Sequence, residues 1–325
     1  MKETDRRSFL KIAGTSIGVG ALLKFAPALG ASPAGAELAR MIKGKTGEAP
    51  RPFSFVQLSD THVGFNGPPN PLGTRAFEEA VRTINALPDA PDLILFTGDL
   101  THDSEDRGEH AARMKKFQEI AQRLNVKNVK LIPGEHDAGL DGGTLFRNVF
   151  GETHYSFDHK GVHFVALDNV SRAKPEVGSE QIEWLKKDLS RFDSAAPIVL
   201  FTHRPLFDLK PEWEWFTNDG DDVMNAVSSY RNLTVLYGHI HRRQVTQLAG
   251  TTHYGANSLI FAFPDPDAGV EKKPLPFDKG RPFANLGVRR IREDQPAAGV
   301  EEIELTAREF AGMAGIQQFL KKEIV

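Results

Sequence analysis

The stretch Leu233–Arg242 reads L-T-V-L-Y-G-H-I-H-R, and it indicates how the chain folds. Its apolar run predicts a buried strand that ends at Gly238, and His239 and His241 follow directly. A strand that stops at a glycine and then presents two imidazoles directs nitrogen ligands towards one point. The same pattern, a short apolar run ending in Asp, His or Glu, occurs four more times upstream.

Each of these upstream runs predicts a strand that precedes candidate ligands. The strands and the residues after them are Phe53–Leu58 with Asp60 and His62, Leu93–Phe96 with Asp99, Val129–Ile132 with Glu135, His136 and Asp137, and Ile198–Phe201 with His203. The runs are nearly continuous in apolar residues, which is typical of parallel strands covered on both faces. In such sheets, ligands bind beyond the carboxyl ends of the strands.

Segments with apolar residues at helical spacing separate the strands and predict an α/β core. The predicted helices are Thr74–Leu87, Glu109–Leu124, Ser179–Leu189, Asp221–Tyr230 and Gly312–Lys322. Further predicted strands are Val162–Leu167, Gln244–Leu248 and Ala256–Phe263, and a terminal hairpin of Leu286–Ile291 and Val300–Leu305 with its turn at Asp294–Gly299.

Composition limits the possible chemistry. The 325 residues are 40% hydrophobic and 26% charged, as in soluble globular proteins. A net charge of −3 gives no strong positive field, so we expect no nucleic-acid partner. The sequence contains no cysteine, which excludes disulfides, thiolate metal sites and thiol catalysis. A metal site must therefore be built from carboxylates and from the eleven histidines.

The N-terminus resembles a twin-arginine export signal. Asp5–Lys11 reads D-R-R-S-F-L-K, and a short, weakly apolar stretch follows it. We therefore expect a signal peptide at 1–31 and a linker at 32–52. The resemblance implies the twin-arginine translocase as a partner and a periplasmic or secreted protein without a stable membrane span. The alternative is a cytoplasmic tail with a chance arginine pair.

The ordered motifs D-T-H, G-D, G-E-H-D, T-H and G-H-I-H resemble those of the calcineurin-like metallophosphoesterase family. The resemblance extends from Phe53 to Phe263. It implies an α/β fold with two mixed β-sheets packed together and helices outside, a four-layer αββα sandwich. We expect the phosphoesterase domain at 53–264, completed by 265–325. The Q-I-E-W-L core of the helix at 178–189 resembles the cyclic-nucleotide phosphodiesterase branch.

The resemblance also implies a ligand set for two metal ions. Asp99 bridges the ions; the first also takes Asp60, His62 and His241, and the second takes Glu135, His203 and His239. Nitrogen and oxygen ligands suit iron, manganese or zinc. A metal-bridging hydroxide would attack the phosphorus of a small phosphoester substrate. His136 would protonate the leaving group, and Asp137 would orient the ring of His136.

Glu135 departs from the family, which has asparagine at this position. We expect Glu135 still to bind the second metal, and its extra negative charge to favour singly charged diesters over doubly charged monoesters. In one alternative, Glu135 points away and the second metal is weakly bound or absent. In another, the chain is an exported metal-binding protein without phosphoesterase activity because Glu135 replaces asparagine. A protein phosphatase is a third reading, supported only by the shared motifs.

Other polar and aromatic residues leave alternatives open. His102 is an extra ligand or phosphate donor, or a loop histidine without a metal role, which we favour. Arg204 contacts a phosphate oxygen or forms a surface salt bridge. Trp213, Trp215 and Phe216 form a lid or cover the sheet. The remaining histidines are expected at the surface or in ordinary packing; they are His110, His154, His159, His163 and His253.

Overall fold

The computed structural model of the chain describes residues 53–292 and 299–305. The expected signal peptide, the linker, the helix at Gly312–Lys322 and the turn at 294–298 lie outside the described residues. The proposed domain limits therefore stay predictions. No helix within the described ranges combines the length and the apolar character that crossing a membrane requires.

Two mixed β-sheets form the centre of the structure. The first contains, in spatial order, β11 (Gly299–Glu304), β10 (Gly287–Arg292), β1 (Ser54–Leu58), β2 (Leu93–Thr97) and β3 (Val129–Ile132). The second contains β4 (Tyr155–His159), β5 (Val162–Ala166), β6 (Ile198–Phe201), β7 (Leu233–Tyr237), β9 (Thr251–Gly255) and β8 (Gln244–Leu248). In the first sheet β1, β2 and β3 run parallel, and β10 pairs antiparallel with β1 and with β11. In the second sheet β5, β6, β7 and β9 run parallel, and β4 and β8 pair antiparallel at the two edges.

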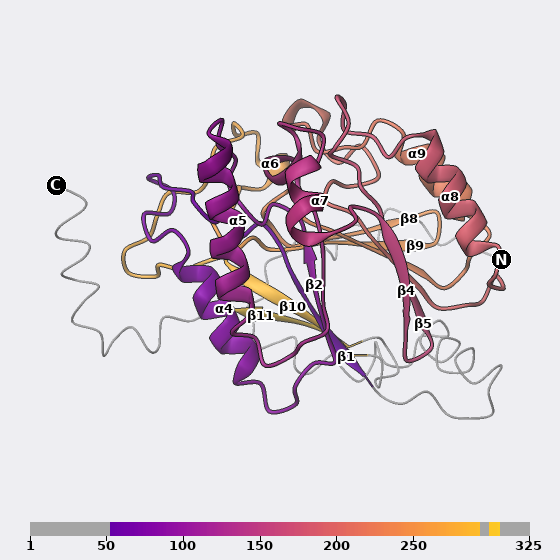
Figure 1. Cartoon of the computed structure of the whole chain (residues 1–325), viewed down its shortest axis with the longest axis horizontal. Coiled ribbons are helices and arrows are strands. Elements are labelled where there is room, and N and C mark those ends of the chain that lie inside the picture. Colours follow the sequence, from indigo (N-terminus) through magenta and orange to yellow (C-terminus); the bar gives the residue numbers. More distant parts are fainter. Residues whose placement is uncertain (1–52, 293–298, 306–325) are drawn as a thin grey trace, which may run out of the picture.

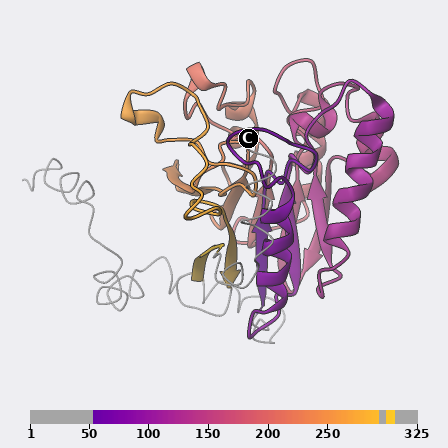
Figure 2. The same ribbon diagram turned by 90° about the vertical axis from the view of Figure 1, so that its left-hand side faces the viewer.

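Helices cover the outer face of each sheet, which confirms the predicted layered fold (Figure 1). The helices α4 (Arg75–Asn85) and α5 (Arg107–Ala121) pack on the first sheet. The helices α8 (Ser179–Leu189) and α9 (Gly220–Val227) pack on the second sheet. After a quarter turn, α4 and α5 face the viewer (Figure 2).

Successive side chains of β6 pack into two different hydrophobic clusters. Ile198 and Leu200 pack with α8 and α9, whereas Val199 and Phe201 belong to the cluster between the two sheets. Because successive side chains of a strand point to opposite faces, a strand apolar throughout fits only where both faces are covered. Each such side chain contributes about 1.5–3 kcal/mol through burial.

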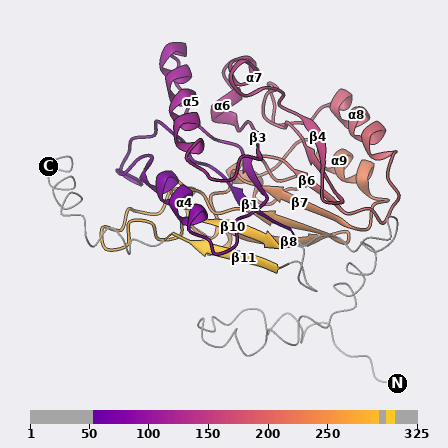
Figure 3. The same cartoon turned by 60° about the horizontal axis from the view of Figure 1, so that its bottom comes forward.

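The C-terminal hairpin is confirmed and joins the first sheet. β10 pairs antiparallel with β11 on one side and with β1 on the other. The three strands lie side by side in Figure 3. β10 is thus hydrogen-bonded to the strand that precedes the first motif.

The strand predicted at Ala256–Phe263 is wrong. Residues 256–263 are irregular, and the strand is the preceding segment, β9. Ala249 and Gly250 have φ values of 47° and 86°, so the chain reverses there and β9 pairs with β8 as a hairpin. The apolar residues after β9 are buried in a loop. Also not predicted were β4 and the short helices α6 (Glu135–Ala138) and α7 (Thr144–Phe150).

Candidate metal centre

The loops after β1, β2, β3, β6 and β7 bring all the predicted ligands together. Their ligand atoms form two main groups, each with atoms within 4.8 Å of one another. These groups are Asp60, His62, Asp99 and His241, and Glu135, His203 and His239. Asp99 Oδ2 lies 3.3 Å from His62 Nε2 and 3.4 Å from His203 Nε2, so its carboxylate links the two groups.

The backbone of these loops is held in an unusual conformation. Non-glycine residues rarely adopt positive φ, at a cost of about 1–3 kcal/mol each. The positive-φ residues of the site are Asp60 (54°), His62 (40°), Asp99 (49°), His239 (64°) and His241 (50°). Such strain persists where the surrounding structure enforces it, and here it directs five side chains towards one centre.

Backbone carbonyls set the tautomers of three histidines. His203 Nδ1 lies 2.7 Å from Thr97 O, and His241 Nδ1 lies 2.9 Å from Phe261 O. His239 Nε2 lies 3.3 Å from the carbonyl oxygen of the residue at 214. A carbonyl only accepts hydrogen bonds, so each of these nitrogens carries the proton. The other ring nitrogen then presents its lone pair to the centre, as metal ligation requires.

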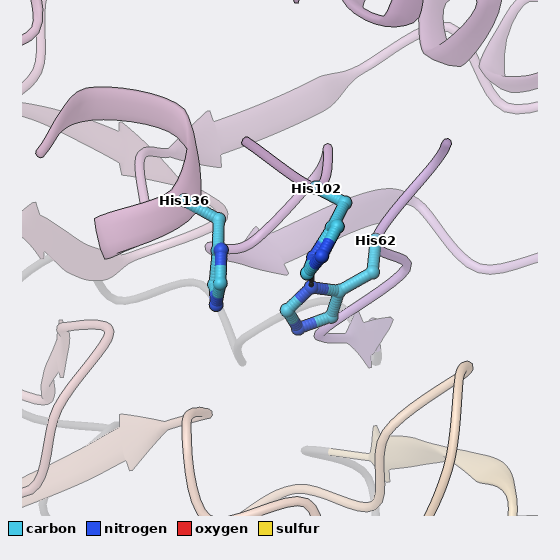
Figure 4. Close-up of side chains that lie close together, drawn as sticks. All are labelled: His62, His102 and His136. Atoms are coloured by element: carbon cyan, nitrogen blue, oxygen red, sulfur yellow. Dashed lines mark hydrogen bonds between the residues drawn. The ribbon is translucent and has the colours of Figure 1, made fainter. Parts of the chain in front are cut away.

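His62 is supported by a second histidine. His62 Nδ1 lies 3.3 Å from His102 Nδ1 (Figure 4). On the other side of the ring, His62 Nε2 lies 3.3 Å from His241 Nε2. Burial, followed by the charges of His136 and His62, lowers the pKa of His102 to about 4, so its ring is neutral. The structure places His102 against a predicted ligand, and our preference for a loop histidine without a metal role stays a prediction.

Glu135 faces the second group, so the alternative in which it points away is wrong. Its Oε2 lies 2.8 Å from His203 Nε2, and its Oε1 lies 2.7 Å from His239 Nδ1. Burial lowers the pKa of His203, but Asp99 and Glu135 outweigh it and raise that pKa well above its usual value.

The residues present fit two cations. Glu135 Oε2 and His203 Nε2 are buried, yet neither has a hydrogen-bond partner of acceptable geometry. His62 Nε2 lies 3.3 Å from His241 Nε2, whose lone pair faces the centre because His241 Nδ1 bonds to a carbonyl. Buried polar atoms without partners are rare and are explained here by ions that the ligands would hold. Nitrogen and carboxylate donors suit iron, manganese or zinc.

Two glycines allow the loops to approach this closely. A Cβ at Gly134 would lie 2.0 Å from Asp99 Oδ1, and a Cβ at Gly238 would lie 2.0 Å from Ser59 Oγ and 2.8 Å from Asp60 Oδ2. The glycines of the G-E-H-D and G-H-I-H motifs are therefore required by contact between loops from different strands.

Gly238→Ala is expected to lower the free energy of unfolding by about 1–3 kcal/mol, because the added methyl group forces Ser59 and Asp60 apart. The displaced Asp60 should also weaken metal binding. Thermal melting and elemental analysis measure the two effects. Gly108→Ala in α5 is the control, since its Cβ would meet only a side-chain atom at 3.1 Å. Unchanged stability and metal content in Gly238→Ala would contradict this account.

The predicted contact between Asp137 and the ring of His136 is wrong. Asp137 accepts hydrogen bonds from the backbone N–H groups of Leu100, Thr101 and Gly134 and from the hydroxyl of Thr101. It therefore holds the loop after Asp99 against the start of α6. The ring contact comes from a residue that the sequence reasoning missed.

That residue is Asp103, whose Oδ1 lies 2.5 Å from His136 Nδ1. Burial lowers the pKa of His136, but Asp99, Asp103 and Glu135 outweigh it and raise the pKa to about 9. His136 N also donates to Asp99 Oδ1, at 3.0 Å. The ring is thus held at the edge of the metal centre, able to give a proton. In the sequence, the signal that could have identified Asp103 is its position four residues after Asp99.

Asp103→Asn is expected to lower kcat about tenfold or more while stability is kept. The substitution removes the negative charge that orients the ring of His136 and raises its pKa. Asp137→Asn should instead lower the free energy of unfolding by about 2–4 kcal/mol, because the new NH₂ group would face buried N–H donors that then lose their acceptor. Parallel kinetics and chemical denaturation separate the two. Equal effects of both variants on kcat and on stability would contradict the assignment.

The tryptophans cover the sheet. Trp213 and Trp215 are buried in a cluster with Tyr237 and Ile240, so the lid reading is not supported. His163 is buried between Asp158 and Asp188, at 2.7 Å from each, away from the metal centre.

Comparison with known proteins agrees with this geometry. Residues 53–243 match calcineurin-like phosphoesterases. The chain belongs to the calcineurin-like phosphoesterase family. This family consists of metal-dependent hydrolases of phosphoesters, and the centre described above contains the side chains for that chemistry.

Relatives in the family differ in their named substrates. The chain is 28% identical, over 59% of its length and 72% of the relative, to a probable glycerophosphodiester phosphodiesterase, GpdQ, of Arcobacter nitrofigilis. It is 24% identical to a probable cyclic nucleotide phosphodiesterase of Vesicomyosocius okutanii, over 58% of this chain and 79% of that one. It is 26% identical to the serine/threonine-protein phosphatase CPPED1 of Bos taurus, over 64% and 74% of the two chains.

Solved structures share the fold. A purple acid phosphatase from yellow lupin aligns with 82% of this chain at a TM-score of 0.57 and 14% identity. The aligned part is 56% of the lupin chain, so this protein spans little more than half of that enzyme. A dimetal phosphatase from Danio rerio aligns with 78% of this chain and 99% of its own, at a TM-score of 0.53 and 13% identity.

Proposed function

We propose that the protein is an exported phosphoesterase with two metal ions that hydrolyses small phosphodiesters in preference to phosphomonoesters. One observation carries the proposal: two groups of buried ligands lie on either side of the carboxylate of Asp99. A single ion would need the ligands of one group alone. Two metal ions held there would supply an activated water as nucleophile and positive charge against the charge that develops on the phosphate.

The side chains perform the remaining steps. Asp60, His62 and His241 would hold one ion, and Glu135 with its two histidine neighbours would hold the other. His136 stands beside the centre with its Nδ1 bonded to Asp103, so its Nε2 would give a proton to the leaving oxygen.

The preference for diesters has two supports. Relatives at 24% and 28% identity carry the names of phosphodiesterases. Glu135 adds a third carboxylate to the ligands, and its charge opposes a doubly charged monoester more than a singly charged diester. Export is supported by the twin-arginine pattern at Asp5–Lys11 alone.

A direct comparison of substrates tests the proposal. The protein is loaded with iron, manganese or zinc and supplied with an aryl phosphodiester and the matching aryl phosphomonoester. We expect hydrolysis of both and a higher kcat/KM for the diester. Activity on neither ester at full metal content would favour the metal-binding protein without catalytic function. Activity on a phosphorylated protein alone would favour the function named for the bovine relative.

A further inference from the structure

We propose that Arg204 is a specificity-determining residue that compensates the charge of Glu135 and so retains doubly charged phosphomonoesters as substrates. The inference rests on the proposed function and extends it to the charge of the substrate. Without Arg204, the third carboxylate would make the site strongly selective for singly charged diesters.

Arg204 lies directly against the second metal group. Its Nη2 is 3.4 Å from Glu135 Oε1, and its Nη1 donates to the carbonyl oxygen of Glu214 at 2.9 Å. Only 13% of the Arg204 side chain is exposed, compared with 27% for Glu135. Charges in so enclosed a place act on each other and on a bound anion more strongly than surface charges do.

A turn anchored by two buried tryptophans holds Arg204 in position. Glu214 has a φ of 59°, and Trp213 and Trp215 on either side of it are buried. The carbonyl oxygen of Glu214 accepts from Arg204 and lies 3.3 Å from Nε2 of His239. One carbonyl oxygen therefore positions both the Arg204 guanidinium and a predicted ligand of the second metal. Arg204 is thus part of the site and does more than form a surface salt bridge.

A second cation stands beside the same turn. Lys272 Nζ donates to Trp213 O at 2.6 Å and lies 3.9 Å from Glu214 Oε2. Burial mainly lowers the pKa of Lys272; Glu214 and Glu135 oppose that shift, and Arg204 adds to it. The loop that follows β9 thus adds positive charge on the side of the site where Glu135 lies.

Glu135 lies among basic groups in this setting. Its Oε2 is 2.8 Å from His203 Nε2, and its Oε1 is 2.7 Å from His239 Nδ1 and 3.4 Å from Arg204 Nη2. Relative to a neutral ligand, Glu135 adds one negative charge and Arg204 adds one positive charge. The pair is therefore close to neutral for an approaching phosphate, and the discrimination expected from Glu135 alone is reduced.

A double-mutant cycle tests this compensation. The variants are Arg204→Met, Glu135→Gln and the double variant, and the measured quantity is the ratio of kcat/KM for the aryl monoester to that for the aryl diester. We expect Arg204→Met to lower the ratio about 10-fold or more, since one unit charge in a partly buried site has an effect of that order. The double variant should return to within about threefold of the original ratio, because the cycle removes both charges.

Two further variants complete the design. Arg204→Lys keeps the charge and should keep most of the ratio. Arg281→Met is the matched control, because Arg281 pairs with Asp278 while 78% of its side chain is exposed. It should leave the ratio and both rates unchanged.

Binding gives a readout that does not depend on turnover. Calorimetry with orthophosphate and with dimethyl phosphate is performed on metal-loaded protein, and elemental analysis checks each variant's metal content. Arg204→Met should weaken orthophosphate binding at least about tenfold more than dimethyl phosphate binding. Arg204→Met retains every predicted ligand, so this comparison stands even if Glu135→Gln loses metal.

The outcomes separate the inference from the proposed function. If Arg204→Met lowers both rates and both affinities equally, Arg204 is only structural and the inference is wrong. A double variant whose ratio stays as low as that of Arg204→Met also overturns it. If the unmodified protein hydrolyses neither ester, the proposed function fails, and the two affinities still decide whether Arg204 selects by charge.

Discussion

Asp99→Asn is expected to lower kcat/KM for phosphoesters about 10³-fold or more and to reduce the metal content to one ion or none. The Asp99 carboxylate lies 3.3 Å from His62 Nε2 and 3.4 Å from His203 Nε2, between the two ligand groups. Two cations in these groups repel each other, and only a charge between them offsets that repulsion. Loss of several kcal/mol of charge stabilisation corresponds to a rate effect of this size.

Metal analysis and steady-state kinetics on the same preparation measure both effects. Asp278→Asn serves as the control, because Asp278 lies in an exposed loop and pairs with Arg281. A variant at Asp99 that keeps two ions and more than a tenth of the activity would show that another group links the metals.

His136→Ala should lower kcat by about 10²- to 10⁴-fold for substrates with poor leaving groups. The effect should be much smaller for a nitrophenyl ester, whose leaving oxygen needs no proton. The reason is the position of the ring, which Asp103 holds at 2.5 Å beside the metal centre. A series of aryl esters of graded leaving-group acidity, compared in the original protein and the variant, measures the dependence.

In this series, the variant should show a steeper dependence of rate on leaving-group acidity. Metal content must be unchanged, because His136 is not expected to bind either ion. An equal loss for every ester, with unchanged metal content, would place His136 in substrate binding instead of proton donation.

Much of the fold could be predicted from the sequence because the central strands are short apolar runs that are easy to recognise. Phe55, Leu95 and Phe201 lie on strands that are apolar on both faces, and each strand ends in a polar motif. The family's pattern of motifs then placed Asp60, Asp99 and His203 at the same end of the sheets, where the structure has them.

The errors arose where local pattern and tertiary environment disagree. Residues 256–263 are as apolar as a strand, yet they are a buried loop because the β8–β9 hairpin occupies the sheet edge. Phe261 in that loop supplies the carbonyl that orients His241, a role with no mark in sequence. β4 was missed because its residues are polar and only partly buried.

The residues that orient the ligands and His136 were the least predictable part of the site. Adjacency suggested Asp137 as the partner of His136, but the helical turn of α6 directs the two side chains apart. Asp103 and His102 come from the preceding loop and reach His136 and His62 across space. Sequence spacing identified the ligands, whereas the contacts that orient them depend on loop conformations that only the fold determines.

The most direct test of this account is anomalous X-ray diffraction from crystals of the metal-loaded protein. We expect two ions, one among Asp60, His62 and His241 and one among Glu135, His203 and His239, with Asp99 between them. A single ion, or ions bound away from these side chains while the phosphoesterase activity is intact, would contradict it.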